Sequence, residues 1–221
     1  MLRLSITAAL CAVPVLLADQ SRRQFDPKPQ AKVLPVDEAI GHPDILDVRA
    51  RLIKAAKRRD LEIILSFTEP SVRVGCKDSG RAALKKLFER EEPNIWSEFY
   101  KSLTLGGMFV DGTFHTNYVV QLYAGQPGET IDGRSYEVVT GANIPVYDRP
   151  AFHGKQVSQL SYEVVLVTNS SDRTDWTQVE FAPSKLGFVR SSSIEAPTGI
   201  SVMISQKPGG WRIIGLDWAC E

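Results

Sequence analysis

The sequence has 221 residues, 43% of them apolar, and its 26 basic residues equal its 26 acidic residues. A chain of this length is sufficient for one large domain or two small ones, each with its own core. The balanced charge argues against nucleic acid and anionic membrane surfaces as partners.

The N-terminus has the layout of a signal peptide. Arg3 precedes an uncharged run that ends at Ala18, and a polar segment follows it. The run contains Pro14 and is shorter than the about 20 apolar residues that a membrane-spanning helix needs. We therefore expect residues 1–18 to be removed during export, with cleavage after Ala18, and the mature protein to be periplasmic or secreted.

Removal of the leader leaves two cysteines, Cys76 and Cys220. Disulfides persist outside the cytoplasm, and an even number of cysteines fits one bridge. The sequence therefore predicts a Cys76–Cys220 disulfide. Two unpaired thiols, or a bridge between two chains through Cys220, remain as alternatives.

A linker and a helix are predicted to follow the leader. Residues 19–43 contain several prolines and show neither a strand nor a helix period, which is typical of an extended linker. From Asp44, which we expect to be the N-cap, apolar residues recur at helical spacing as far as Ala56. The basic run Lys54–Arg59 is explained by its place at the helix C-terminus, where cations offset the helix dipole.

The remaining pattern divides the chain into an α-rich part and a β-rich part. Further helices are expected at residues 60–67, from near Ser79 and from Pro93, with a strand at residues 71–76 between the first two. After residue 107, short apolar runs alternate with turn residues, which predicts an all-β second half. The KPGG segment, Lys207–Gly210, predicts the turn of a C-terminal hairpin.

Residues 138–196 carry a series of spaced strand and turn positions. The series comprises Asn143, Pro145–Tyr147, Pro150, Leu160, Trp176 with Val179, and Gly187–Val189. In this order the positions resemble the bacterial SH3-like family. Two departures from the family pattern are Ser161–Tyr162, where glycine is usual, and Ile144–Pro145, where Val-Arg is common.

A second resemblance covers most of the rest of the chain. Residues 44–110 and the terminal hairpin resemble the nuclear-transport-factor-2-like cone, a helical layer on a curved antiparallel sheet. The order of the segments is similar to that of uncharacterised SH3-containing exported proteins. The resemblance implies an α+β fold, with a cone-like domain at residues 44–135 and 197–221 and an SH3-like β-barrel at residues 136–196. It supplies no established activity.

The resemblance also indicates where a ligand would bind, since SH3-like barrels usually bind in loops beside their first strand. Tyr147, Asp148, Trp176 and Phe188 are the candidate ligand-binding residues, because aromatic faces offer a large contact area with a polar edge. The alternative is that Trp176 and Phe188 belong to the barrel core. We expect a noncatalytic protein that binds peptidoglycan or a protein or peptide partner.

Two other functions remain open from the sequence. Cone-like folds host acid/base chemistry, for which Asp111, His115 and Asp217 are the candidates here. A purely structural assembly protein is the third possibility. No metal site or cofactor is expected, because three scattered histidines without CxxC, HxH or HExxH spacing, and no nucleotide-binding or serine-hydrolase motif, offer none of the usual signals.

Overall fold

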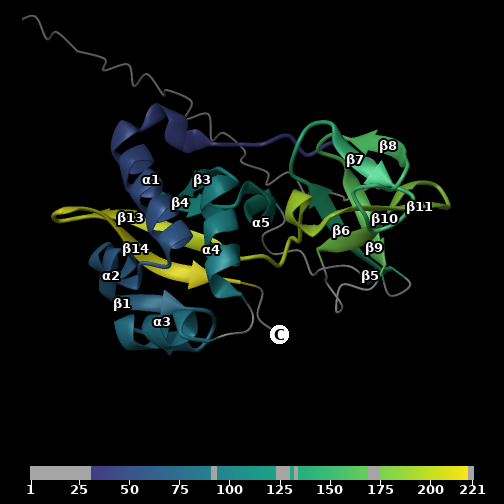
Figure 1. Ribbon diagram of the computed structural model, residues 1–221. Helices are drawn as coiled ribbons and strands as arrows, with labels where there is room; N and C mark the ends of the chain where they lie inside the picture. The colour runs from purple at the N-terminus through teal and green to yellow at the C-terminus, as the bar shows by residue number, and fades with distance from the viewer. Residues whose placement is uncertain (1–30, 91–93, 123–129, 132–133, 169–174, 219–221) are drawn as a thin grey trace, which may run out of the picture.

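The computed structural model describes residues 31–90, 94–122, 130–131, 134–168 and 175–218. Helices gather on one sheet, and a second, antiparallel sheet lies beside them (Figure 1). This arrangement confirms the predicted α+β class. Over the described ranges, no helix combines the length and the apolar character that crossing a membrane requires. The predicted signal peptide lies outside the described residues.

The helices lie mainly before the second sheet in the sequence. They are α1 (Pro43–Arg58), α2 (Leu61–Ser66), α3 (Arg81–Phe88), α4 (Ile95–Thr104) and α5 (Tyr118–Leu122), with 3₁₀ turns η1 (Glu38–Gly41) and η2 (Ser191–Ser193). Side chains cap two of the α-helices. Asp60 accepts from the amide of Ile63 at the start of α2, and Asn94 accepts from the amide of Ser97 at the start of α4. Such caps satisfy backbone amides that have no partner within the helix.

Two helix starts differ from the sequence predictions. α1 begins at Pro43, because proline suits the first helical turn, where its missing N–H is not needed. Asp44 therefore lies inside the helix, and its Oδ2 accepts a hydrogen bond from the Trp211 indole nitrogen at 2.6 Å. That bond holds the pKa of Asp44 below its ordinary value. α4 begins only at Ile95, so Pro93, which is outside the described residues, precedes the helix.

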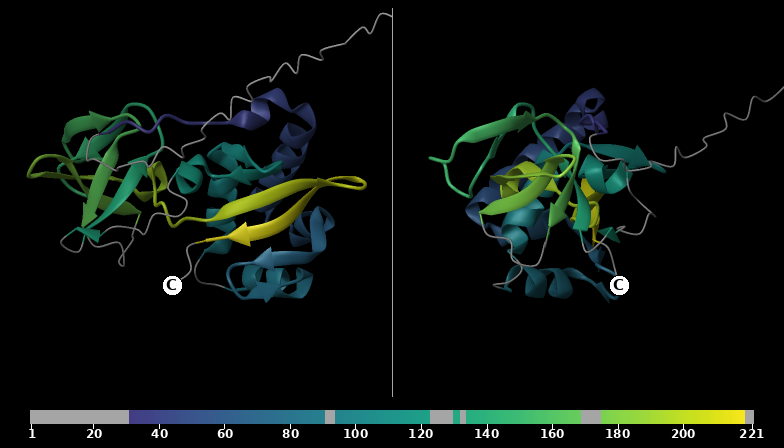
Figure 2. Two further views of the ribbon diagram at one scale, coloured as in Figure 1. Left: turned by 180° about the vertical axis from the view of Figure 1, so that it is seen from behind. Right: turned by 90° about the vertical axis from the view of Figure 1, so that its right-hand side faces the viewer.

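The two strands of the first sheet that come last in the sequence lie in its middle. Its order is β2 (Asp78–Ser79), β1 (Thr68–Val74), β14 (Gly210–Asp217), β13 (Ser201–Lys207), β4 (Thr113–Thr116) and β3 (Gly107–Val110). Neighbours are antiparallel except β1 and β14, which run parallel with Val74 opposite Leu216. The hairpin that KPGG predicts is present as β13 and β14, which Figure 2 shows in yellow projecting beyond the helices.

Helices α1, α3 and α4 cover one face of this sheet and bury its apolar side chains. Each large aliphatic or aromatic side chain that is fully buried contributes about 1.5–3 kcal/mol of hydrophobic free energy. The largest completely buried members of this core are Ile45, Leu52, Ile64, Leu84, Phe99, Leu103, Phe114, Ile204 and Ile213. These side chains form the main core between the helices and the first sheet.

The second sheet is formed from the segments between α5 and the terminal hairpin. Its order is β12 (Ile194–Glu195), β6 (Arg134–Val139), β9 (Val164–Thr168), β10 (Trp176–Ala182), β11 (Lys185–Arg190), β7 (Ile144–Tyr147) and β8 (Gln156–Leu160), and β5 (Thr130–Ile131) pairs with β6. Among the described residues the pairings run as an open path from β12 to β8. One face buries a compact group dominated by valines, including Val139, Val146, Val165, Val167, Val179 and Val189.

The prediction that the second half is entirely β is wrong at α5. The apolar run after Thr113 divides at Asn117, which adopts a left-handed backbone with φ of 64°. Asn117 is completely buried, and its Nδ2 donates to Glu195 Oε1 at 2.7 Å and to the Ile200 carbonyl at 3.0 Å. Asparagine tolerates this conformation better than most residues, so the chain turns from β4 into a short helix.

Residues 31–42 differ from the linker that the sequence predicts. This N-terminal arm joins both sheets through its backbone, as its purple trace in Figure 1 shows. Val33 N donates to the Tyr162 carbonyl at 2.7 Å, and Gly107 N donates to the Val36 carbonyl at 2.9 Å. Val33 and Ala39 are buried. Hydrogen bonding between main chains does not require a regular spacing of apolar residues, so the sequence pattern did not predict that residues 31–42 pair with the sheets.

Candidate functional site

The end of β7 and strands β10 and β11 of the second sheet have an aromatic outer face opposite the valine core. Side chains alternate between the two faces of a strand. Val179 in β10 and Val189 in β11 point into the core, and Trp176, Phe188 and Arg190, each an odd number of residues from these valines, occupy the other face. Trp176 and Phe188 are only half-buried and belong to no buried cluster. The alternative that they form the core is therefore wrong.

Three aromatic rings from separate segments meet on this face. Tyr147 at the end of β7 lies edge-on to Trp176, with ring centroids 5.5 Å apart and an interplanar angle of 89°. Phe152, from the loop between β7 and β8, also packs against Trp176, with ring centroids 5.2 Å apart. Phe152 is 71% exposed, an unusual position for a large apolar side chain.

Arg190 completes this group. Its guanidinium carbon lies 5.1 Å from the centroid of the Trp176 ring and 4.8 Å from that of Phe152. At such distances the cation is attracted to the aromatic faces, an effect of about 0.5–1 kcal/mol at exposed sites. Its Nη1 also lies 3.4 Å from the carboxylate of Asp175, which is exposed. The guanidinium is thus held in place while part of it faces solvent.

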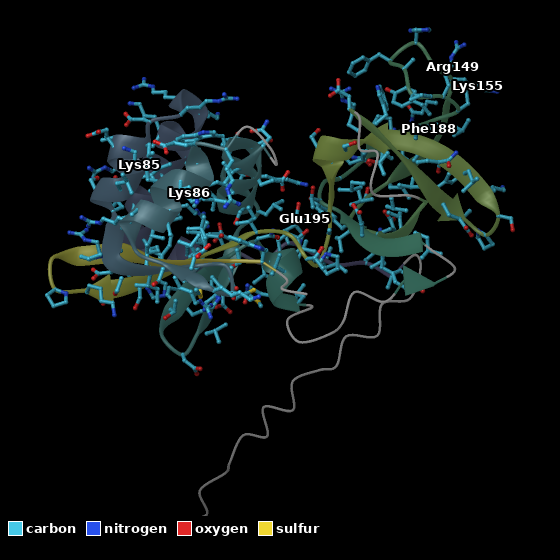
Figure 3. All side chains as sticks on the ribbon, turned by 90° about the horizontal axis from the view of Figure 1, so that it is seen from below. Lys85, Lys86, Arg149, Lys155, Phe188 and Glu195 are labelled. Atoms are coloured by element: carbon cyan, nitrogen blue, oxygen red, sulfur yellow. The ribbon has the colours of Figure 1, made fainter. Side chains whose placement is uncertain are left out.

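Phe188 and Tyr147 are joined through the sheet. They are direct partners in the pairing of β11 with β7, and Phe188 also lies opposite Gln178 of β10. Figure 3 shows Phe188 on the side of the sheet beside the loop that carries Arg149 and Lys155. We call Tyr147, Phe152, Trp176, Phe188 and Arg190 the aromatic patch.

Asp148 has a structural part in the loop beside the patch. Its backbone N–H donates to the Lys155 carbonyl, and its Oδ1 accepts from the Lys155 amide, both at 3.0 Å. Arg149 Nη2 donates to the His153 carbonyl within the same loop at 3.2 Å. These bonds close the loop that presents Phe152, so Asp148 shapes the patch from its edge.

The structure therefore brings Tyr147, Trp176 and Phe188 onto one surface, with Asp148 supporting the adjacent loop. Sequence analysis missed Phe152 and Arg190. Arg190 carried a usable signal, because it lies two residues after Phe188 in a strand and so shares its face. Phe152 carried none, since its contact with Trp176 depends on the fold of a loop.

The three acid/base candidates lie elsewhere. His115 is on the face of the first sheet opposite α1, α3 and α4, and Asp217 is paired there with Arg73 at 2.9 Å. Asp111 is in the turn between β3 and β4. Burial holds the pKa of His115 below its ordinary value, with nearby Asp217 and Asp111 opposing that shift and Arg73 reinforcing it.

A cavity of about 350 Å³ lies between α3, the start of α4 and residues 198–200. Apolar side chains such as Leu87 and Trp218 line most of it, together with Arg90 and Glu98. Asp111, His115 and Asp217 do not contribute to its wall. The geometry consequently gives the acid/base alternative less support than it gives the aromatic patch.

Cys76 follows β1 in a turn, and Cys220 lies outside the described residues. The preceding residue, Gly75, donates its N–H to the Leu216 carbonyl at 2.8 Å and lies against the ring of Trp218. The chain at Cys76 thus runs beside the end of β14. The disulfide stays a prediction.

No model of a protein family matches the chain, and no curated protein matches it.

Proposed function

We propose that this chain is an exported, noncatalytic protein that binds peptidoglycan or a peptide partner through the aromatic patch. The observation that carries the proposal is the assembly of Tyr147, Phe152 and Trp176 around Arg190 on an outer face, away from the valine core. Exposed aromatic groups of this kind are enriched at binding surfaces, because they present a large apolar area together with polar edges.

The composition of the patch suits a ligand with both apolar and polar parts. Ring faces stack on sugar rings or apolar side chains, and Arg190 offers hydrogen-bond donors to carboxylate or carbonyl groups. The surrounding loop adds the cationic side chains of Arg149 and Lys155. Peptidoglycan, in which sugars carry peptides with carboxylates, combines these features.

The second sheet is, in this proposal, an SH3-like β-barrel at residues 136–196. It would be inserted before the last two strands of a cone-like domain at residues 44–135 and 197–221. Support comes from the sequence resemblance and from the strand order, since β13 and β14 return to the first sheet after the second has been formed. The patch includes the end of β7 and its following loop, the region that the resemblance implies for ligands.

Co-sedimentation with insoluble peptidoglycan, and binding to a soluble stem peptide measured by fluorescence of the tryptophans, test the proposal. We expect the intact chain to bind, and Trp176→Ala and Phe188→Ala to bind at least 10-fold more weakly. Ile40→Ala serves as the matched control, because Ile40 is an exposed apolar residue on the arm, distant from the patch.

Two outcomes would overturn the proposal. One is an intact, folded chain that binds neither probe. The other is a Trp176→Ala chain that binds as tightly as the Ile40→Ala control.

A further inference from the structure

Two methionines lie on either side of one histidine on the face of the first sheet opposite α1, α3 and α4. Met108 of β3 and Met203 of β13 are both direct partners of His115 in β4. Their neighbours in the same strands, such as Phe114 and Val202, point into the core, so these three side chains share the opposite face. The sequence has only three methionines, and the third is Met1.

Such a row places three soft or borderline metal ligands within reach of one point. Side chains directly opposite each other in antiparallel strands have Cβ atoms about 4.5–5.5 Å apart. Thioether sulfurs select soft ions such as Cu(I), and imidazole also binds copper well. Over the described ranges no three His, Cys, Asp or Glu residues gather as a metal site, so the harder metals that prefer such ligands have no comparable place.

The charges around His115 fit a monovalent cation. Asp217, Asp111 and Arg73 are the charged groups that act on its ring, and together they carry one net negative charge. Arg73 is held by the Asp217 carboxylate at 2.9 Å. A cation bound beside His115 would therefore neutralise this surface.

The Met203 side chain is directed over Gly215, which lies between Met203 and Arg73 in the same row, and its methyl end occupies the space where a side chain at Gly215 would be. Met203 Sδ accepts from Arg73 Nη2 at 3.4 Å. Methionine has three rotatable side-chain bonds, so its sulfur is able to exchange this weak contact for one beside His115.

We propose that Met108, His115 and Met203 form a binding site for one Cu(I) ion. The site is on the first sheet and is independent of the aromatic patch. Methionine and histidine are neutral ligands, which do not have to lose a proton before they bind a metal in neutral solution.

The test uses the full chain, oxidised and then treated with iodoacetamide so that no thiol competes. Ag(I) serves as the redox-stable probe, and Cu(I) is measured by competition with bicinchoninate. With ¹³C-methyl-labelled methionine, we expect the Met108 and Met203 methyl resonances to shift together and to reach saturation at one equivalent, while the Met1 resonance stays in place. Met108→Leu, Met203→Leu and His115→Gln should each weaken Cu(I) binding at least 10-fold.

His153→Gln is the matched control, since His153 lies in the exposed β7–β8 loop, and it should bind Cu(I) like the wild type. Leucine is close to methionine in volume, so the two leucine variants should remain folded, which circular dichroism verifies. Methionine resonances that do not move with stoichiometric Ag(I) would overturn the proposal. Leucine variants with wild-type Cu(I) affinity would do so as well.

Discussion

Lys101 Nζ lies 2.5 Å from Glu195 Oε2 and links α4, on the first sheet, to β12 of the second. The two side chains are 18% and 3% exposed, and Asn117 donates to the other carboxylate oxygen of Glu195. Figure 3 shows Glu195 between the two parts of the molecule. A buried carboxylate with two partners from the neighbouring part fixes how the sheets are joined.

Removal of the cation from this pair should destabilise the fold. Lys101→Met leaves Glu195 buried without its counter-charge, and we expect a loss of about 3 kcal/mol in the free energy of unfolding. Urea denaturation followed by circular dichroism measures the change. The matched control is Lys85→Met, which breaks an ion pair with Glu89 whose side chains are 59% and 58% exposed, and should lose less than about 1 kcal/mol. Equal losses in the two variants would contradict this role of Lys101.

Alkaline pH should weaken the fold through Tyr118. Burial, with smaller effects of Tyr162 and Glu195, raises the pKa of Tyr118 from its ordinary value of 10.0 to about 12. As pH rises through this window, the unfolded chain releases a proton that the folded chain retains, so the stability present below pH 10 is lost towards pH 12. The Tyr118 hydroxyl also has no hydrogen-bond partner among the described residues.

Tyr118→Phe should therefore be at least as stable as the wild type at neutral pH and lose less stability in alkali. Urea midpoints measured below pH 10 and near pH 12 test both statements. A variant that loses as much stability as the wild type across this range would show that another group controls the alkaline transition.

Asp37→Asn should loosen the N-terminal arm. The Asp37 carboxylate accepts from both terminal nitrogens of Arg49, at 2.7 and 2.6 Å, and its neutral amide replacement keeps neither the charge nor the paired acceptors. We expect a loss of about 2 kcal/mol, together with faster hydrogen exchange at the amide of Gly107, which the arm protects. Asp47→Asn, in an exposed pair with Arg51, is the control and should change neither measurement.

The predicted Cys76–Cys220 disulfide should appear in a peptide map made without reductant. Backbone pairing of Gly75 with Leu216 sets the chain before Cys76 beside the end of β14, and a bridge that closes so long a loop stabilises by about 5 kcal/mol in the chain-entropy model. We expect one linked peptide, and a lower melting temperature for Cys76→Ser. Two separately alkylated cysteines, or a covalent dimer, would establish one of the alternatives instead.

The helical part of the fold was predictable because its buried apolar residues recur at helical spacing. Ile45, Val48 and Leu52 recur at helical spacing, and the structure buries all three on one face of α1. The sequence pattern did not predict the turn of the backbone where a buried polar residue causes it. Asn117 lies within an apolar run, and only its buried bonds to Glu195 and Ile200 explain why a helix begins there.

The candidate site was predictable in part. Tyr147, Trp176 and Phe188 followed from the resemblance of their segment, and strand alternation then distinguishes their face from that of the valines. The contacts of Phe152 with Trp176 and Arg190 depend on the fold of a loop. Met203 lies opposite His115 through the pairing of β13 with β4, which joins segments distant in sequence. No local pattern contains these contacts, so they became visible only in the folded chain.

The central position of β14 also determines when the protein is able to fold. β1 pairs in parallel with β14, which the ribosome makes more than a hundred residues later. β4 pairs with β13, the strand that forms a hairpin with β14. A chain delivered N-terminus first, whether from a ribosome or through a membrane channel, lacks the middle of its first sheet until residue 217 has emerged. Such distant pairing slows folding, so the emerging chain stays without a complete first sheet for longer than a chain with local pairings would.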